Sequence, residues 1–209
     1  MEKLFDLPYF TLTMVMQMKG ASVHNARVWL SRQNKANKVV RLTNGVYMSR
    51  AKYDRYRDNP DFVGMVANII QPHSYLSGEW VLQKYGVMTE AIFNVTCVTT
   101  KHTREIENPV GRFIYTNITD KLFDGYSEKL MDGIMVREAS VAKALYDLLY
   151  LRKTPSRIKE DMYFLSEDLR LNLTHLDKSV KLEFEEWVNK YQSPKMKLIR
   201  DNLRRSGWE

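Results

Sequence analysis

The sequence predicts an α+β fold in two parts, and three features of its first 59 residues define the first part. Residues 22–35 repeat apolar side chains at the spacing of an amphipathic helix, residues 38–48 alternate as strands do, and Asn44-Gly45 marks a hairpin turn. An opening helix over residues 4–10 and a second short helix precede them. This order predicts a winged helix-turn-helix, followed by a mixed α/β domain with a small sheet and a helical C-terminal tail.

The two helices before the hairpin have their own start and stop signals. Thr11 and Ser22 carry hydroxyls that can accept a free backbone N–H at a helix start. Gly20 can adopt the left-handed conformation in which the first helix would end. Ala26 and Leu30 give the second helix a narrow apolar stripe, so its other face is left free to contact a partner.

The hairpin is predicted from the change of period after residue 37. Alternation places Val40 and Leu42 on one face of the first strand, and Val39 and Arg41 on the other. We expect Asn44-Gly45 to form a type I′ turn, which requires a positive φ at both positions.

Charge is distributed unevenly along the chain. The whole sequence has 32 Lys+Arg and 25 Asp+Glu, a net charge of +7, and residues 1–59 alone carry this excess. Residues 60–209 are neutral, and no acidic residue lies between Asp6 and Asp54. Because a surface of one sign attracts phosphates and releases their counterions, the N-terminal part is expected to bind nucleic acid.

The length allows one large or two small domains, and we expect two, at residues 1–59 and 60–209 with Asn59-Pro60 at the join. The apolar runs are shorter than the roughly 20 residues of a membrane span, and the N-terminus lacks the apolar core of a signal peptide. Cys97 is the only cysteine, and the four histidines are not spaced as metal ligands usually are. We therefore expect a cytoplasmic protein with no membrane association, no metal and no cofactor.

Patterns in residues 60–209 predict a small sheet accompanied by helices. Strands are expected at 93–100, 112–118, 121–126 and 134–136. Helices are expected at 138–152, 178–191 and 194–205, the first started by Ser140 and the last by Ser193-Pro194. The polar stretches at 49–62 and 101–111 are expected to be connecting segments.

Several polar or reactive side chains could be catalytic, but we prefer a structural role for each of them. Ser77 is expected to cap a helix rather than act as a nucleophile, since it lacks a Gly-x-Ser-x-Gly context. Cys97 is expected to be a small buried hydrophobe rather than a reactive thiol. Lys143 and Asp147 fall at i,i+4 and are expected to form a surface pair. The basic final helix either presents a solvated face or contacts an acidic partner or flanking DNA.

No catalytic motif is visible, so an enzyme is not predicted. The sequence has no Gly-rich phosphate loop, and its polar residues do not follow the order of a known catalytic triad. No pair of carboxylates can be identified from the sequence as a general acid and a general base. The alternative is an enzyme whose active site is assembled from residues that lie far apart in sequence within 60–209.

The chain resembles the AbiEi family, the antitoxins and transcriptional regulators of type IV abortive-infection toxin–antitoxin systems. The resemblance covers roughly residues 4–152. It rests on the spacing of Ser22, Ala26 and Leu30 and on four segments: VVRLTNGVYM (39–48), SYLSGEWVLQKYGVMTEA (74–91), VTCVTT (95–100) and ASVAKALYDLLYLR (139–152). Family wings usually begin at a glycine, whereas Asn37 stands at this position here.

The resemblance implies two functions. The winged helix would bind inverted repeats in double-stranded DNA of its own promoter and repress the operon. The C-terminal domain would counteract a cognate nucleotidyltransferase-like toxin, with or without a stable complex. The alternative is a winged-helix module that contacts protein or RNA and has no antitoxin role.

The DNA-contacting residues are predicted from the outer face of the second helix and from the hairpin. Side chains on the helix would meet base edges in the major groove, while basic residues after it would contact phosphates and the hairpin tip the backbone or minor groove. Val28 would contact a thymine methyl group or, alternatively, occupy a core position. The predicted set is Ser22, His24, Asn25, Arg27, Val28, Ser31, Arg32, Lys35, Lys38, Arg41, Asn44 and Arg50.

Overall fold

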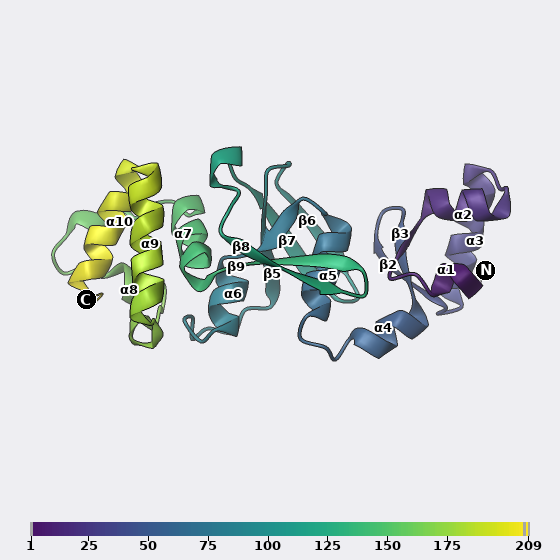
Figure 1. The fold of residues 1–209 in the computed structure, drawn as a ribbon, viewed down its shortest axis with the longest axis horizontal. Coiled ribbons are helices and arrows are strands. Elements are labelled where there is room, and N and C mark those ends of the chain that lie inside the picture. Colours follow the sequence, from purple (N-terminus) through teal and green to yellow (C-terminus); the bar gives the residue numbers. More distant parts are fainter. Residues whose placement is uncertain (1, 207, 209) are drawn as a thin grey trace.

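The structure is a computed structural model that describes residues 2–206 and 208, and it confirms a mixed α+β fold. Within these residues, ten α-helices accompany one three-stranded and one six-stranded sheet. The elements follow one another along the long axis of the molecule, with the N-terminal helices at one end and the C-terminal helices at the other (Figure 1). None of the described helices combines the length and the apolar character that a membrane crossing requires.

The N-terminal elements form in the predicted order. They are α1 (Glu2–Phe5), β1 (Phe10–Thr11), α2 (Leu12–Lys19), α3 (Val23–Lys35), β2 (Val39–Thr43), β3 (Val46–Ser49) and α4 (Arg50–Tyr56). Thr11 and Ser22 accept backbone N–H groups as the predicted caps of α2 and α3, and Gly20 ends α2 at φ 56°. The opening helix is shorter than expected, because Phe10 leaves it to pair with Tyr47 in an antiparallel sheet of order β1-β3-β2.

The hairpin differs from the prediction in two ways. Gly45 has φ +75° but Asn44 does not have a positive φ, so the turn is not type I′. The β2–β3 register shifts between Arg41 and Thr43, and this irregularity accompanies the different turn. Val39 and Val40 are both buried, although they point to opposite faces, because β2 lies between two hydrophobic clusters.

Asn37 follows the end of α3 and has φ 54°, the left-handed conformation that glycine adopts most easily. Its side-chain oxygen accepts a hydrogen bond from Arg50 Nη1 at 3.0 Å. Alanine is strained at positive φ and lacks this acceptor. We therefore expect Asn37→Ala to lower the free energy of unfolding by about 1–2 kcal/mol in urea denaturation. Asn37→Gly, which relieves the strain, should lose less; equal losses would contradict this account.

The six-stranded sheet has the order β6-β7-β5-β4-β9-β8. The β5–β7 and β4–β9 pairs are parallel and the other pairs are antiparallel. Its strands are β4 (Ser74–Leu76), β5 (Asn94–Thr99), β6 (Arg104–Asn108), β7 (Gly111–Asn117), β8 (Tyr126–Met131) and β9 (Ile134–Ala139). The accompanying helices are α5 (Phe62–Ile70), α6 (Glu79–Lys84) and α7 (Val141–Leu151).

Several expectations for this region were wrong. The polar stretch 101–111 contains β6, which is stabilised by pairing with β7 rather than by apolar residues of its own. The expected strand at 121–126 begins instead with the end of a 3-10 helix, Asp120–Leu122, continues without regular structure over residues 123–125, and reaches β8 only at Tyr126. The polar connector at 49–62 contains α4, and α5 was not predicted at all.

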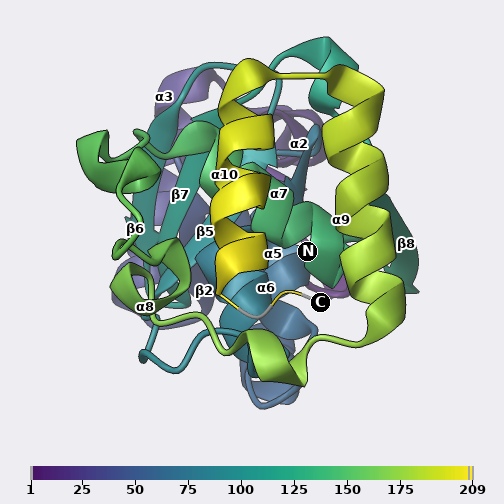
Figure 2. The same cartoon turned by 90° about the vertical axis from the view of Figure 1, so that its left-hand side faces the viewer.

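The C-terminal helices are α8 (Leu165–Asp168), α9 (Lys178–Tyr191) and α10 (Pro194–Arg205). Of these, α9 and α10 cover α7 on the side away from the sheet (Figure 2). Ser193 caps α10 as predicted. Phe184 and Val188 of α9 are buried, as are Ala144 and Leu145 of α7. As a result, α7 lies between the sheet and the C-terminal helices, and its residues 142–149 are all buried.

The β2–β3 hairpin also packs against the six-stranded sheet, which we call the central sheet. Val40, Leu42 and Met48 belong to the same hydrophobic cluster as α5 and the strands. The Asn108 side-chain amide donates to the Leu42 carbonyl at 2.9 Å. Lys52 of α4 forms an ion pair with Asp132 of the β8–β9 turn at 2.7 Å. These contacts fix the orientation of the hairpin relative to residues 60–209.

Candidate nucleic-acid interface

Helix α3 buries its narrow apolar stripe and exposes the opposite face. Ala26 and Leu30 are 0% and 1% exposed, so they anchor the helix to the N-terminal core. Of the predicted contact residues, all except Arg50 are exposed; the exposed ones are Ser22, His24, Asn25, Arg27, Val28, Ser31, Arg32, Lys35, Lys38, Arg41 and Asn44. Val28 is 36% exposed, so its alternative placement in the core is wrong.

The cations on this face are not neutralised. Within the part of the chain that the structure describes, no carboxylate pairs with Arg27, Arg32, Lys35 or Lys38. Elsewhere on the molecule, by contrast, many cations face an acidic side chain, among them Arg112, Arg137 and Arg204. The outer face of α3 and the residues that follow it therefore form a surface of one sign.

Arg50 differs from the other predicted phosphate contacts. It is half-buried and forms an ion pair with Asp54 at 2.9 Å, four residues along α4. The hydrogen bond from Arg50 lowers the pKa of the Asp54 carboxyl. Since Arg50 also donates to Asn37, its guanidinium stabilises the junction between α3 and the hairpin and has less freedom to bind phosphate.

The hairpin tip and α3 enclose a shallow pocket of about 270 Å³. Arg27 and Ser31 line it from α3, and Arg41 and Asn44 line it from the hairpin. Arg41 donates to the Asn44 side chain at 3.3 Å, which holds the guanidinium along the tip. The structure therefore brings together predicted residues that are up to 17 positions apart in sequence.

Asn34 is an exposed polar residue of this face that the sequence analysis missed. It lines the same pocket, three residues after Ser31 and seven after Arg27. The i, i+4, i+7 spacing of Arg27, Ser31 and Asn34 is the signal that would have identified it. Asn34 also lines a neighbouring hollow of about 470 Å³, whose far side carries Glu105 and Glu107 of β6. Because Glu105 pairs with Arg112, Glu107 is the carboxylate that borders the cationic face where β6 approaches the hairpin.

The basic residues of α10 do not form a second free cationic surface. Arg200 and Arg204 both face Glu185 of α9, and Arg205 faces Asp161. Lys195 donates to backbone carbonyls at the end of α7. These contacts explain the basic helix as part of the C-terminal packing.

Lys143 and Asp147 do not form a surface pair, contrary to the prediction. Both side chains are fully buried and form an ion pair between the sheet and the C-terminal helices. Tyr75 and Ser77 donate their hydroxyl hydrogens to Asp147 Oδ2 at 2.9 and 2.8 Å. The Lys143 ammonium also donates to Tyr75 and lies 5.3 Å from the centre of the Trp187 ring. We call Tyr75, Ser77, Lys143 and Asp147 the buried polar cluster.

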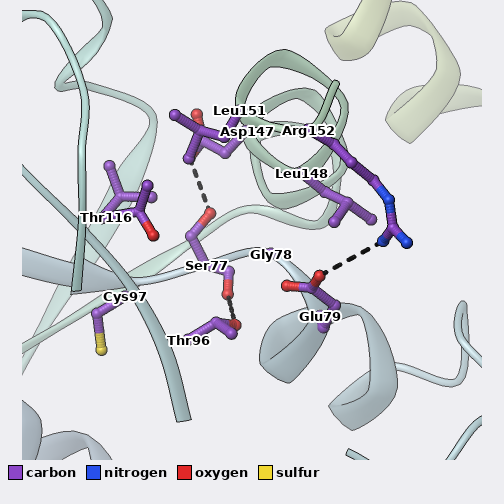
Figure 3. Close-up of a pocket in the computed structure, with 11 residues that line it drawn as sticks. Ser77, Gly78, Glu79, Thr96, Cys97, Thr116, Asp147, Leu148, Leu151 and Arg152 are labelled. Atoms are coloured by element: carbon purple, nitrogen blue, oxygen red, sulfur yellow. Dashed lines mark hydrogen bonds and ion pairs between the residues drawn. The ribbon is translucent and has the colours of Figure 1, made fainter. Parts of the chain in front are cut away.

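Burial dominates the ionisation of this cluster. It raises the pKa of the Asp147 carboxyl and lowers the pKa of the Lys143 ammonium, while their mutual attraction opposes both shifts. Ser77 is not a helix cap, because Gly78 occupies the cap position of α6 at φ 62° and ψ −140°. Its hydroxyl is instead committed to Asp147, as Figure 3 shows.

Cys97 lies at the centre of β5 and is 2% exposed. Burial raises the pKa of its thiol, so the thiolate required for reactivity is disfavoured. This agrees with the interpretation of Cys97 as a small buried hydrophobe.

Among the described residues, no group of three or more His, Cys, Asp and Glu side chains is arranged to hold a metal ion. Comparison with known proteins gave no relative: no protein-family model and no curated protein sequence matches the chain. The geometry of the cationic face is therefore the main basis for a functional proposal.

Proposed function

We propose that this protein is a sequence-specific DNA-binding transcriptional repressor whose residues 1–59 act as a winged helix-turn-helix. The observation that carries the proposal is the exposed face of α3, whose cations have no carboxylate partner in the described chain. In such a domain, the second helix enters the major groove and the hairpin follows the backbone. Here α3 would be that helix and β2–β3 the wing.

The side chains on α3 have the chemistry needed to distinguish base pairs. Arg32 can donate two hydrogen bonds to guanine, and Asn25 can pair with adenine. Val28 offers an apolar contact for a thymine methyl group. Lys35 and Lys38, which follow toward the hairpin, would contact phosphates and set the register.

The resemblance to AbiEi proteins extends this proposal to a biological role. The protein would be the cytoplasmic antitoxin of a type IV abortive-infection system and would repress its own operon by binding inverted repeats. Residues 60–209 would counteract a nucleotidyltransferase-like toxin without enzymatic activity. Since the hairpin packs against the central sheet, these residues would also hold the wing in position.

Competition binding tests the proposal against an RNA-binding or protein-binding module. Fluorescence anisotropy would follow the full chain on a labelled duplex from its own upstream region. An excess of unrelated duplex or of RNA should displace little protein, because specific sites bind typically 10³-fold or more tighter than random DNA. Equal displacement by unrelated duplex would contradict sequence specificity, and stronger displacement by RNA would favour the alternative.

A further inference from the structure

A pocket of about 220 Å³ lies between α7 and the sheet, beside the buried polar cluster. Val98, Leu148 and Leu151 supply its apolar lining, while Ser77 and the half-exposed Glu79 supply oxygen atoms (Figure 3). Its volume is that of roughly seven molecules of liquid water, so it can hold a small organic molecule. The DNA-binding proposal assigns no role to it.

The hydrogen bonds of the cluster determine which polar groups the pocket offers. The Ser77 hydroxyl hydrogen is directed to Asp147 at 2.8 Å, because the buried carboxylate requires its donors. Ser77 Oγ can therefore offer only its lone pairs to a ligand. Thr96 has no hydrogen left to donate to a ligand, since it donates to the Ser77 carbonyl at 2.5 Å, and it already accepts from the Trp80 N–H at 3.0 Å.

The rim of the pocket adds a second acceptor. Glu79 faces Arg152 across 3.8 Å, longer than a hydrogen bond, and their side chains are 29% and 53% exposed. Such a loose and solvated pair is worth about 1 kcal/mol or less, so a ligand cation can replace Arg152 at the carboxylate. A Cβ at Gly78, between Ser77 and Glu79, would lie 3.4 Å from Thr96 Oγ1 at a positive φ of 62°, so glycine suits this position in the pocket wall.

We propose that this pocket binds a short aliphatic primary amine. The ligand ammonium donates to Ser77 Oγ and to the Glu79 carboxylate, and its carbon chain packs against Leu148 and Leu151. An ammonium suits the site between Ser77 and Glu79 because Ser77 Oγ and the Glu79 carboxylate present acceptors rather than donors. For an anionic ligand, the only positively charged donor in the pocket lining is the exposed guanidinium of Arg152.

Ligand-observed NMR titration of the full chain with n-butylamine tests this proposal, with n-butanol and butyrate as probes of matched size. We expect saturable binding of the amine, and weaker binding of both controls. Glu79→Gln removes the charge of the rim acceptor and should weaken amine binding about tenfold. Arg152→Gln removes the competing cation and should strengthen binding roughly twofold to fivefold.

The matched control is Glu90→Gln, the same exchange at a residue that pairs with Arg170 outside the pocket lining. It should leave amine binding unchanged, and a thermal melt of each variant would verify that it folds. The proposal is overturned if the wild type shows no saturable amine binding, or if Glu79→Gln and Glu90→Gln behave alike. It is equally overturned if butyrate binds better and Arg152→Gln abolishes that binding.

Discussion

Lys143→Met is expected to lower the free energy of unfolding by about 3–5 kcal/mol, since removing one member of a buried ion pair leaves the other charge without compensation. Asp147 is fully buried, and after the substitution only the hydroxyls of Tyr75 and Ser77 would donate to it. The carboxyl would have to take up a proton or remain as an unpaired charge in an apolar environment. Denaturation in guanidinium chloride, followed by circular dichroism, measures the loss.

The matched control for this prediction is Arg157→Met, which breaks an ion pair with Glu160 whose two side chains are 64% and 57% exposed. Its effect should be below about 1 kcal/mol, as for other solvated pairs. The double variant Lys143→Met/Asp147→Leu should be more stable than Lys143→Met alone, because no buried charge remains. Similar losses for Lys143→Met and Arg157→Met would show that the cluster does not stabilise the fold as described.

Arg32→Ala is expected to weaken binding to the specific DNA site by about 1–3 kcal/mol and to relax discrimination at one base pair. The Arg32 side chain is exposed on α3 and, among the described residues, has no acidic partner, so its removal should leave the fold intact. Anisotropy titrations on a set of single-base variants of the site would measure both effects.

A suitable control is Arg204→Ala, which removes an exposed arginine on α10 that pairs with Glu185. We expect its affinity for DNA to match that of the wild type. If Arg32→Ala binds every sequence variant as the wild type does, the placement of α3 in the major groove is wrong. If Arg204→Ala weakens binding instead, the C-terminal helices contact the DNA.

Features that depend on local interactions were predictable from the sequence. Thr11, Ser22 and Ser140 accept the N–H groups expected of helix caps, because a hydroxyl three residues before a free N–H suffices. The burial of Ala26 and Leu30 likewise follows from their spacing on one helix face. The helices of the candidate interface were therefore found in their correct places.

Features that depend on distant residues were not predictable. Lys143 and Asp147 have the spacing of a surface pair, and only the packing of α9 and α10 over α7 shows that they are buried. Ser77 has a capping pattern, but Asp147, 70 residues later in sequence, accepts its hydroxyl hydrogen. Strand β6 carries few apolar residues and exists because β7 pairs with it.

The salt dependence of binding to the upstream duplex tests the central claim, that the unpaired cations of the N-terminal face bind DNA. Phosphate contacts by the unpaired Lys35, Lys38 and Arg41 predict that log K falls linearly with log salt concentration, with a slope of about −3. Lys38→Ala should reduce the magnitude of this slope by about 1 and weaken all sequences alike. A slope near zero, or one that Lys38→Ala leaves unchanged, would contradict the account.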